Sequence, residues 1–472
     1  MRDLTARLRE IVRRETARSP AGEATAARGN EEQGTTAVPA SPTRELTYVP
    51  DPHLSEPCGP IADALGGTNV DAAGACVMIE RRYDGTRSHG RRRLDACVPV
   101  ATAPIGVFDP RVTTAAGWWR KAVFFDIETT GLSGGAGTLA FLVGCGWFDA
   151  EGFVVRQFFL AGPAGEKPML DALRDVFADS TLLVTYNGRT FDVPFMETRW
   201  AFHWSSAPTD GLLHFDMLPP ARRLWSRRGQ LSTKPGAGPT AESDGCSLTA
   251  LERRVLGFHR QDDVPGFEIP ARYFHFLRSG DAAAIEGVLE HNRHDLVSLA
   301  VMMAHALWLV EEGPEACRDP GEQIALGRLY ERVLRAEDAV RAYEIAAACG
   351  DGPTAAHALA RTALLRRRQR RFDDAAEAWQ RIVDLSPRDR RRSAPLVRRA
   401  VEALAIHHEH RVRDLDSARR YADELSASAT GRERDEIDRR LQRLERKMQR
   451  QGLQVSPAAQ TLQYELDETS GE

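Results

Sequence analysis

The stretch that decides the fold is Lys121–Leu132, which reads KAVFFDIETTGL. The apolar run at 122–125 predicts a buried strand. Asp126 and Glu128 follow at a spacing of two, so both side chains point to the same face of that strand. Two carboxylates at a buried strand end repel each other and lose hydration, which favours a cation between them. The pattern indicates a site for Mg²⁺ or Mn²⁺, and the alternative is an ordinary strand end whose acids cap the next loop.

The composition is that of a chain with more than one domain and no disulfide framework. Its 472 residues exceed the length of a typical single domain, and 42% hydrophobic with 28% charged residues is typical of soluble proteins. The seven cysteines are scattered and form no CxxC pair, which argues for a reducing compartment and against a zinc site. No apolar run as long as a membrane span and no secretory signal are evident. We therefore expect a cytoplasmic protein without a membrane contact.

The ends of the chain predict little regular structure. Residues 1–45 read as a short amphipathic helix followed by a disordered segment, and 451–472 read as a disordered tail. Residues 46–119 contain short β-prone pieces at 75–79 and 96–100, separated by turn residues. We interpret 46–119 as a small β-rich lead-in that packs on the following domain.

The segment 120–312 alternates between strand and helix patterns. After the first strand, further strands are predicted at 138–148, 153–160, 182–186 and 212–217, and helices at 166–177, 191–203 and 281–313. Three antiparallel strands followed by alternating helices and strands indicate a mixed sheet with helices on both faces. Arg227–Ser247 reads as a flexible insert.

A second acid follows the fourth predicted strand, in the stretch NGRTFDVP at 187–194. Asn187 and Gly188 end that strand with turn residues, and Asp192 lies in the first turn of the next helix. Asp192 is either a carboxylate that interacts with the helix dipole or a third metal ligand above the strand ends. Asp216 ends the fifth strand and is a candidate supporting acid.

A third polar cluster, EHNRHD at 290–295, lies on the last helix of this segment. His291 and Asp295 are four positions apart, so they share one face of the helix. A His beside a metal-binding Asp suits the activation of a water molecule. The alternative is a pair of surface histidines beside an ordinary acid.

Taken in order, these clusters resemble the DEDD superfamily of 3′ to 5′ exonucleases. The matching residues are Asp126, Glu128, Asp192, Asp295 and His291. The resemblance is closer to bacterial proteins with a YprB-type ribonuclease H-like domain joined to tetratricopeptide repeats. It is carried by DIETTGLSGGAGTLAFLVGCGWF, YNGRTFDVP, HFDMLPPARRLW and LEHNRHDLVSL, within about 120–312. The histidine class of these enzymes places its His five positions before the last Asp, whereas His291 has the four-position spacing of the tyrosine class.

The resemblance implies that 120–312 is an α/β ribonuclease H-like nuclease domain with a mixed five-stranded sheet flanked by helices. It also implies that the four carboxylates hold two divalent metal ions, Mg²⁺ or Mn²⁺, roughly 3.5 to 4 Å apart, and that His291 takes a proton from the attacking water. The implied substrate-binding residues are Thr129, Gly131, Leu132, Asn187 and Phe191.

Residues 320–450 predict an all-α domain of tetratricopeptide-like repeats. The repeat positions are Leu326, Gly327, Tyr330, Ala339, Tyr343 and Ala346 in one unit, and Ala375, Trp379 and Pro387 in another. Small residues allow paired helices to approach each other, and 431–450 reads as a charged terminal helix. Such stacks bind peptides or protein partners on a concave face. Arginine runs at 366–368, 370–371 and 390–392 could contact phosphates, but the chain is rich in Arg throughout, which favours a solvated or peptide-facing surface.

The leading hypothesis is a metal-dependent hydrolase, a 3′ to 5′ exonuclease that cleaves the phosphodiester bonds of DNA or RNA by a two-metal mechanism. The first alternative is a nucleic-acid-binding module with weak or no catalysis, which the spacing of His291 motivates. The second alternative is a tetratricopeptide scaffold protein. No phosphate-binding GxxxxGK[ST] motif is present, so we expect no ATP-driven step.

Overall fold

The structure is a computed structural model that describes residues 59–98, 105–115, 117–131, 137–226, 245–385, 395–427 and 429–450. The predictions for 1–45, for most of the insert at 227–247 and for the tail at 451–472 lie outside these residues.

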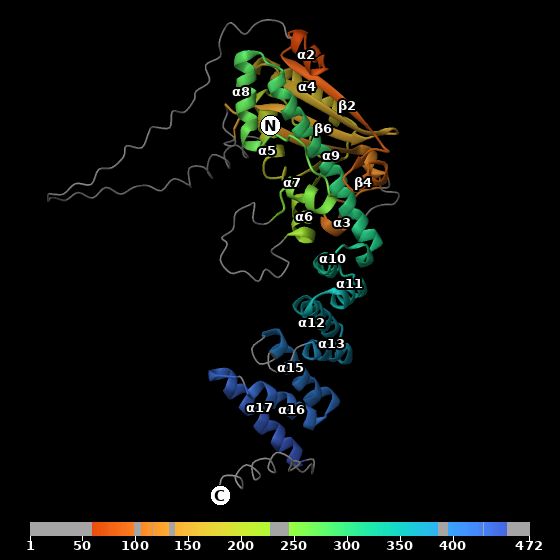
Figure 1. The fold of residues 1–472 in the computed structure, drawn as a ribbon, viewed down its shortest axis with the longest axis vertical. Coiled ribbons are helices and arrows are strands. Elements are labelled where there is room, and N and C mark those ends of the chain that lie inside the picture. Colours follow the sequence, from red (N-terminus) through yellow and green to blue (C-terminus); the bar gives the residue numbers. More distant parts are fainter. Residues whose placement is uncertain are drawn as a thin grey trace, which may run out of the picture. The chain divides into compact units, whose positions relative to one another are not determined.

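A mixed sheet of seven strands organises the first part of the described chain (Figure 1). The strands lie in the order β1-β2-β7-β6-β5-β8-β9. Their bounds are Thr68–Asn69 (β1), Cys76–Asp84 (β2), Ala122–Thr129 (β5), Ala140–Phe148 (β6), Gly152–Leu160 (β7), Leu182–Thr185 (β8) and Leu213–Asp216 (β9). A separate ribbon pairs Ser88–His89 (β3) with Arg92–Arg93 (β4). β5 runs parallel to β8, which is parallel to β9, whereas the other neighbours are antiparallel.

The predicted number of five strands was wrong, because β1 and β2 extend the sheet beyond β7. β2 pairs with β7 along its whole length, from Cys76 opposite Leu160 to Asp84 opposite Gly152. The β-propensity of this segment was visible in the sequence, but its partner lies far along the chain. The second β-prone piece also differs, because Asp95–Cys97 form a 3₁₀ turn (η1) that buries Cys97 in the core.

Helices cover both faces of the sheet. They are Gly59–Leu65 (α2), Ile105–Phe108 (α3), Glu166–Phe177 (α4), Asp192–Phe202 (α5), Leu218–Trp225 (α6), Leu248–Leu251 (α7), Ile269–Ser279 (α8) and Ala283–Glu312 (α9), with a π-helix at Glu252–Leu256 (η6). Short 3₁₀ turns lie at Trp118–Lys121 (η2), Pro163–Gly165 (η3), Gly266–Glu268 (η7) and Pro314–Ala316 (η8). α4, α5 and α8 share a core with Val123 and Phe125 of β5. α6 and the second half of α9 share another core with Phe124, so β5 is buried on both faces.

Helix α9 is the longest helix of the described residues, at 30 residues. The carboxylate of Asp281 accepts a hydrogen bond from the N–H of Ala283 (3.0 Å) where the helix starts. Among the described residues, α9 is the one helix long and apolar enough to cross a membrane by length and composition alone, which differs from the expectation of no apolar run of that length. However, 72% of its most apolar window is buried inside the protein, so packing accounts for its apolar character.

The second part of the described chain is helical (Figure 1). Its helices are Pro320–Arg332 (α10), Ala336–Cys349 (α11), Gly352–Arg368 (α12), Phe372–Asp384 (α13), Pro395–His407 (α15), Leu415–Ser426 (α16) and Gly431–Arg450 (α17), with a π-helix at His408–Val412 (η9). Neighbours in sequence pack on each other from α10 to α13 and from α15 to α17. This agrees with the predicted helical region and with the charged helix at 431–450, while its tetratricopeptide character stays a prediction.

The helical part packs directly on α6 and α9. The indole N–H of Trp225 in α6 donates a hydrogen bond to Glu322 of α10 (2.6 Å). The hydroxyl of Tyr330 donates to the carbonyl oxygen of Val310 in α9 (3.1 Å). The apolar side chains around these contacts form one continuous core from the sheet to α10 and α11.

We predict that Gly327→Ala destabilises the helical part. A methyl group at Gly327 would lie 2.5 Å from the ring of Tyr343, so α10 and α11 would have to separate. We expect the free energy of unfolding to fall by about 1–3 kcal/mol, as for other overpacked cores. Urea denaturation followed by circular dichroism measures this change.

Gly352→Ala is the matched control, because a methyl group there meets no atom within 4 Å. We expect its free energy of unfolding to change by less than about 0.5 kcal/mol. Equal destabilisation by the two substitutions would contradict the close α10–α11 packing.

Candidate active site

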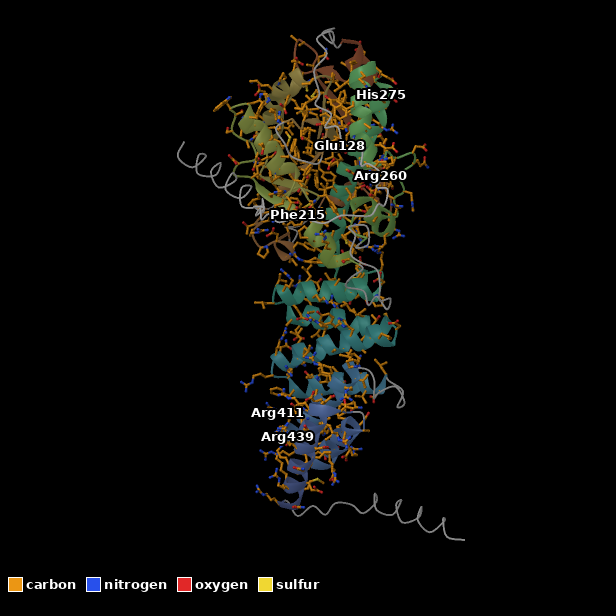
Figure 2. All side chains as sticks on the ribbon, turned by 90° about the vertical axis from the view of Figure 1, so that its left-hand side faces the viewer. Glu128, Phe215, Arg260, His275, Arg411 and Arg439 are labelled. Carbon is orange, nitrogen blue, oxygen red and sulfur yellow. The ribbon has the colours of Figure 1, made fainter. Side chains whose placement is uncertain are left out.

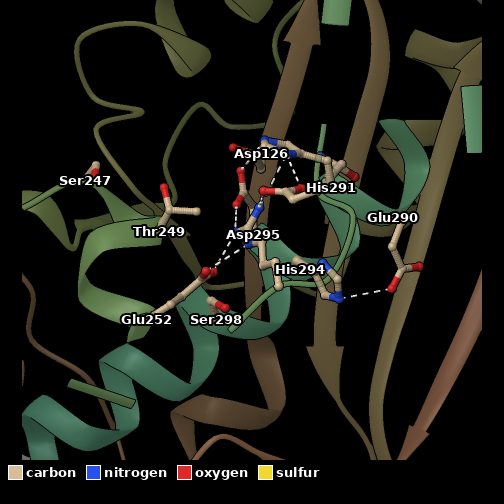
Figure 3. A network of polar contacts seen from close by, with 12 residues as sticks. Asp126, Ser247, Thr249, Glu252, Glu290, His291, His294, Asp295 and Ser298 are labelled. Atoms are coloured by element: carbon tan, nitrogen blue, oxygen red, sulfur yellow. Dashed lines mark hydrogen bonds and ion pairs between the residues drawn. The ribbon is translucent and has the colours of Figure 1, made fainter. Parts of the chain in front are cut away.

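The candidate site lies where the end of β5 meets α9. Asp126 and Glu128 project from β5. His291 and Asp295 project from one face of α9, close to Asp126 (Figure 3). β8 pairs with β5 only at 122–124, so the end of β5 that carries the acids is not covered by a strand on that side. The alternation of side chains along β5 and the helical spacing on α9 thus bring the first and third predicted clusters together.

Three of the predicted side chains could hold one metal ion. The Nε2 atom of His291 lies 3.6 Å from Oδ2 of Asp295 and 4.0 Å from Oε1 of Glu128. One ligand atom from each of these residues lies within 4.8 Å of the others. Their side chains are 14–20% exposed, so the group is sheltered but open to solvent.

Asp126 is held by a buried amide network. The Nδ2 atom of Asn292 donates a hydrogen bond to Oδ2 of Asp126 (2.8 Å), and Gln157 in turn donates to Oδ1 of Asn292 (2.8 Å). Gly144 of β6 makes room for this amide, because a methyl group there would lie 2.2 Å from Oδ1 of Asn292. The sequence showed Asn292 inside the EHNRHD stretch, but its neutral side chain gave no reason to select it.

Asp192 is the first residue of α5 and is buried. Its carboxylate accepts a hydrogen bond from the backbone N–H of Ile127 in β5. The negative charge of Asp192 contributes to the raised pKa values of Asp126 and Glu128. Asp216 acts on the neighbouring loop, because it accepts hydrogen bonds from the backbone N–H groups of Asn187 (2.8 Å) and Arg189 (3.2 Å). Asp216 therefore shapes the turn that leads to Asp192.

The carboxyl groups of the cluster are difficult to ionise. Burial, followed by repulsion from Asp295, raises the pKa of Glu128 to about 8 and the pKa of Asp126 well above its ordinary value. Burial also raises the pKa of Asp192 to about 7, with added repulsion from Asp216 and Asp295. A cation between these carboxylates would offset both their lost hydration and their mutual repulsion. The donor set therefore fits a divalent metal ion.

Arg260 provides a positive charge that the sequence patterns did not reveal. Arg260 is labelled in Figure 2, in the same part of the protein as Glu128. Its side chain is 4% exposed and forms ion pairs with Glu252 (2.5 Å) and Asp295. Burial lowers the pKa of Arg260, but Asp295 and Glu252 together raise it above its ordinary value. Glu252 is the first residue of the short π-helix η6, and Arg260 lies in the loop after it, where no periodic pattern marks a residue as buried.

Asp263 is a second residue that the sequence patterns missed. Its Oδ1 atom lies 2.8 Å from Nδ1 of His291. A hydrogen bond from Nδ1 to Asp263 fixes the ring so that Nε2 faces Glu128 and Asp295. The four-position spacing of His291 and Asp295 is thus compatible with a histidine that faces the carboxylates.

Four of the predicted substrate-binding residues lie at the end of β5 and after β8, beside the carboxylates. The hydroxyl of Thr129 donates a hydrogen bond to the carbonyl of Gly131 (3.0 Å) directly after β5. Asn187 is exposed after β8 with a φ of 68°, and Phe191 stacks on Phe195 at 6.0 Å. Leu132 lies outside the described residues. The contacts of these residues with a substrate stay a prediction.

A sequence profile of the RNase_H superfamily matches residues 123–307. Residues 123–307 are therefore an RNase_H superfamily domain. The match runs from β5 to α9 and includes all four predicted carboxylates and His291. Membership of this superfamily suggests a nuclease-type hydrolase with a nucleic-acid substrate.

A relative matches beyond this domain. The chain is 29% identical over 380 residues to the uncharacterized protein YprB of Bacillus subtilis (strain 168). The match covers 79% of this chain and 86% of the relative, so it includes residues outside the RNase_H superfamily domain. Together, the two comparisons confirm the resemblance to YprB-type proteins with a ribonuclease H-like domain, whereas the DEDD assignment and the tetratricopeptide repeats stay predictions.

We predict that the metal-free protein loses stability as the pH rises. Glu128 and Asp192 have folded-state pKa values raised from 4.5 and 3.8 to about 8 and 7, so the folded state binds more protons than the unfolded state between these values. Their contribution is fully present below about pH 4 and is lost as the pH rises through 7 to 8. Melting temperatures in EDTA from pH 5 to 8 measure this loss, which Mg²⁺ or Mn²⁺ is expected to reverse at pH 8.

The variant Asp192→Asn should flatten this pH dependence, because it removes one of the raised carboxyl groups. Asp210→Asn is the matched control at an exposed acid and should leave the profile unchanged. A wild-type melting temperature that is equal at pH 5 and 8 in EDTA and insensitive to both ions would contradict a cation site.

Proposed function

We propose that the protein is a metal-dependent nuclease that removes nucleotides from the 3′ end of DNA or RNA by hydrolysing phosphodiester bonds. The observation that carries the proposal is the buried carboxylate cluster on β5, α5 and α9 of an RNase_H superfamily domain. Buried acids with raised pKa values are costly for folding and are typical of functional sites.

The residues that would hold divalent ions are Asp126, Glu128, Asp192 and Asp295. Their oxygen atoms suit Mg²⁺ or Mn²⁺, and Glu128, Asp295 and His291 already lie close enough for shared coordination. Bound divalent ions would lower the pKa of the attacking water and stabilise the oxygen that leaves. Asn292 keeps Asp126 in place through its hydrogen bond, and Ile127 does the same for Asp192.

His291 would accept the proton of the attacking water on Nε2. This atom faces the carboxylates, while Nδ1 is held by Asp263. When Nε2 takes up a proton, the carboxylate of Asp263 stabilises the resulting positive charge. The terminal nucleotide would contact four residues beside the carboxylates, namely Thr129, Gly131, Asn187 and Phe191.

One observation favours a second candidate, a nucleic-acid-binding module with weak catalysis. Arg260 forms an ion pair with Asp295 and therefore competes with a metal ion for this carboxylate. In that case the domain would bind nucleic acid without cleaving it, and Arg260→Gln would raise the affinity for Mn²⁺.

We further propose a cytoplasmic location. The six described cysteines, all free of disulfides, are consistent with a reducing compartment. Protein or peptide partners would bind the helical part.

We predict that Asp126→Asn abolishes cleavage of labelled single-stranded DNA and RNA in Mg²⁺ or Mn²⁺. The rate should fall about 1000-fold, because several kcal/mol of transition-state stabilisation depend on the metal ligands. Gel analysis of 3′- and 5′-labelled oligonucleotides measures the rate and also the product lengths.

Products that shorten by single nucleotides from the 3′ end would support the exonuclease, whereas internal fragments would contradict it. Asp210→Asn is the control and should cleave like the wild type. Equal cleavage by Asp126→Asn would show that the activity comes from another protein, and binding without cleavage by the wild type would favour the second candidate.

We predict separate effects for His291 and Asp263 on kcat. Loss of the proton acceptor in His291→Ala should lower kcat about 10²- to 10⁴-fold. Asp263→Ala should lower kcat about 10- to 100-fold, because the imidazole loses its orienting partner. Asp263→Asn should retain more activity, since its amide oxygen still accepts the hydrogen bond from Nδ1.

Steady-state kinetics with one oligonucleotide measure these values, and KM should change little. Asp262→Asn, at the exposed neighbouring position, is the control. An Asp263→Ala variant with wild-type kcat would exclude a positioning role for Asp263.

A further inference from the structure

A basic pocket lies between α6 of the RNase_H superfamily domain and helices α10 and α12. Its volume is about 500 Å³. Five arginines line it, namely Arg222, Arg223, Arg328, Arg332 and Arg361, and no acid of the described residues does. The other lining residues are small, polar or apolar. The pocket therefore concentrates positive charge where the two parts of the chain meet.

Most of this charge is not neutralised. Within the described residues, Arg361 forms an ion pair with Glu331 (2.7 Å), whereas the other four arginines form none. Arg223 and Arg328 donate instead to neutral partners, the carbonyl of Phe108 (2.6 Å) and His357 (2.7 Å). Burial and the nearby charge of Arg332 both lower the pKa of Arg223, although the carboxylate of Asp109 acts in the opposite direction. The guanidinium groups of Arg223 and Arg332 therefore repel each other. An anion in the pocket would remove this repulsion.

The arginine-rich composition does not explain the pocket. The arginine runs selected from the sequence contain paired residues: Arg366 bonds to Glu337 (2.7 Å) and Arg368 to Glu331 (3.3 Å). Arg371 pairs with Asp374 in the same way. The four pocket arginines that form no ion pair within the described residues lie instead at the contact of α6 with α10 and α12, and only Arg222 and Arg223 among them are adjacent in sequence.

We propose that this pocket binds the phosphate backbone of the nucleic-acid strand whose end lies in the candidate active site, an inference that rests on the proposed function. Guanidinium groups match phosphate oxygens in charge and geometry. The pocket wall formed by α6 follows directly after Asp216, which shapes the loop beside the site. Because α6 is joined in this way to the loop beside the candidate active site, the favoured ligand of the pocket is a substrate strand and not an acidic peptide.

The length of α9 gives the number of nucleotides that would lie between the candidate active site and the basic pocket. Asp295 lies in the candidate site, and Val310 contacts Tyr330 of α10, the helix that carries two of the pocket arginines. These residues are fifteen positions apart, which is about 22 Å along a helix. At about 3.4 Å per stacked nucleotide, roughly six nucleotides span this distance. A strand shorter than this would not contact the candidate active site and the basic pocket at the same time.

The first experiment measures binding by the full chain without cleavage. Asp126→Asn in EDTA is titrated with a fluorescent single-stranded 20-mer, with and without the added pair Arg222→Glu/Arg332→Glu. Both arginines are exposed, so folding should be retained. Each phosphate contact on a single strand contributes about fivefold at 0.1 M salt, so affinity should fall about 25-fold and the salt dependence should become shallower.

The matched control is Arg278→Glu/Arg439→Glu, which changes the net charge equally at exposed positions in α8 and α17 that do not line the pocket. If both double variants weaken binding equally, the effect reflects total charge and the proposal is overturned. A polyglutamate peptide is titrated in the same way as a second ligand. The proposal is also overturned if the pocket variant binds the 20-mer as tightly as the protein without the added pair, or if only its affinity for the peptide falls.

The second experiment uses the active protein and two substrate lengths. The preference for a 20-mer over a 4-mer, measured as the ratio of kcat/KM values, should fall about 25-fold in the pocket variant. An unchanged ratio would overturn the proposal. The binding experiment does not require cleavage, so a wild type that binds but does not cleave would refute the proposed function and leave the pocket supported.

Discussion

The repulsion among buried carboxylates at the end of β5 is the constraint on which the site depends. Asp126 and Glu128 share a strand face, and α5 and α9 add Asp192 and Asp295 to the same place. Inside the protein such charges interact more strongly than in water. The surrounding residues reduce the cost in specific ways: Asn292 donates to Asp126, Ile127 donates to Asp192, and Arg260 pairs with Asp295.

Side-chain contacts also account for the position of the segment between α7 and α8 beside the site. Glu252 and Arg260 form a buried ion pair, and Asp263 holds His291, although all three lie between α7 and α8. A buried ion pair of this kind contributes little to stability but fixes geometry when all partners are present. The segment 252–263 therefore supplies two side chains that contact the site directly, Arg260 and Asp263, and one that holds Arg260, Glu252.

The sequence predicted the parts of the fold that periodicity controls. β5, α4 and α9 were expected close to their observed bounds, and the spacing of His291 and Asp295 correctly placed them on one helix face. Long-range pairing was not predictable in this way, so the addition of β2 to the sheet was missed. Arg260, Asp263 and Asn292 were also missed, because their roles depend on neighbours that are distant in sequence.

Helix α9 belongs equally to the site and to the helical part. Val310 accepts a hydrogen bond from Tyr330, and Trp225 of α6 donates one to Glu322 of α10. A fragment that stopped at Gly313 would leave the Trp225 indole without its acceptor and would expose apolar side chains of α9 to water. The two parts are consequently not interchangeable modules, and the shortest fragment with an intact end of α9 includes α10 and α11.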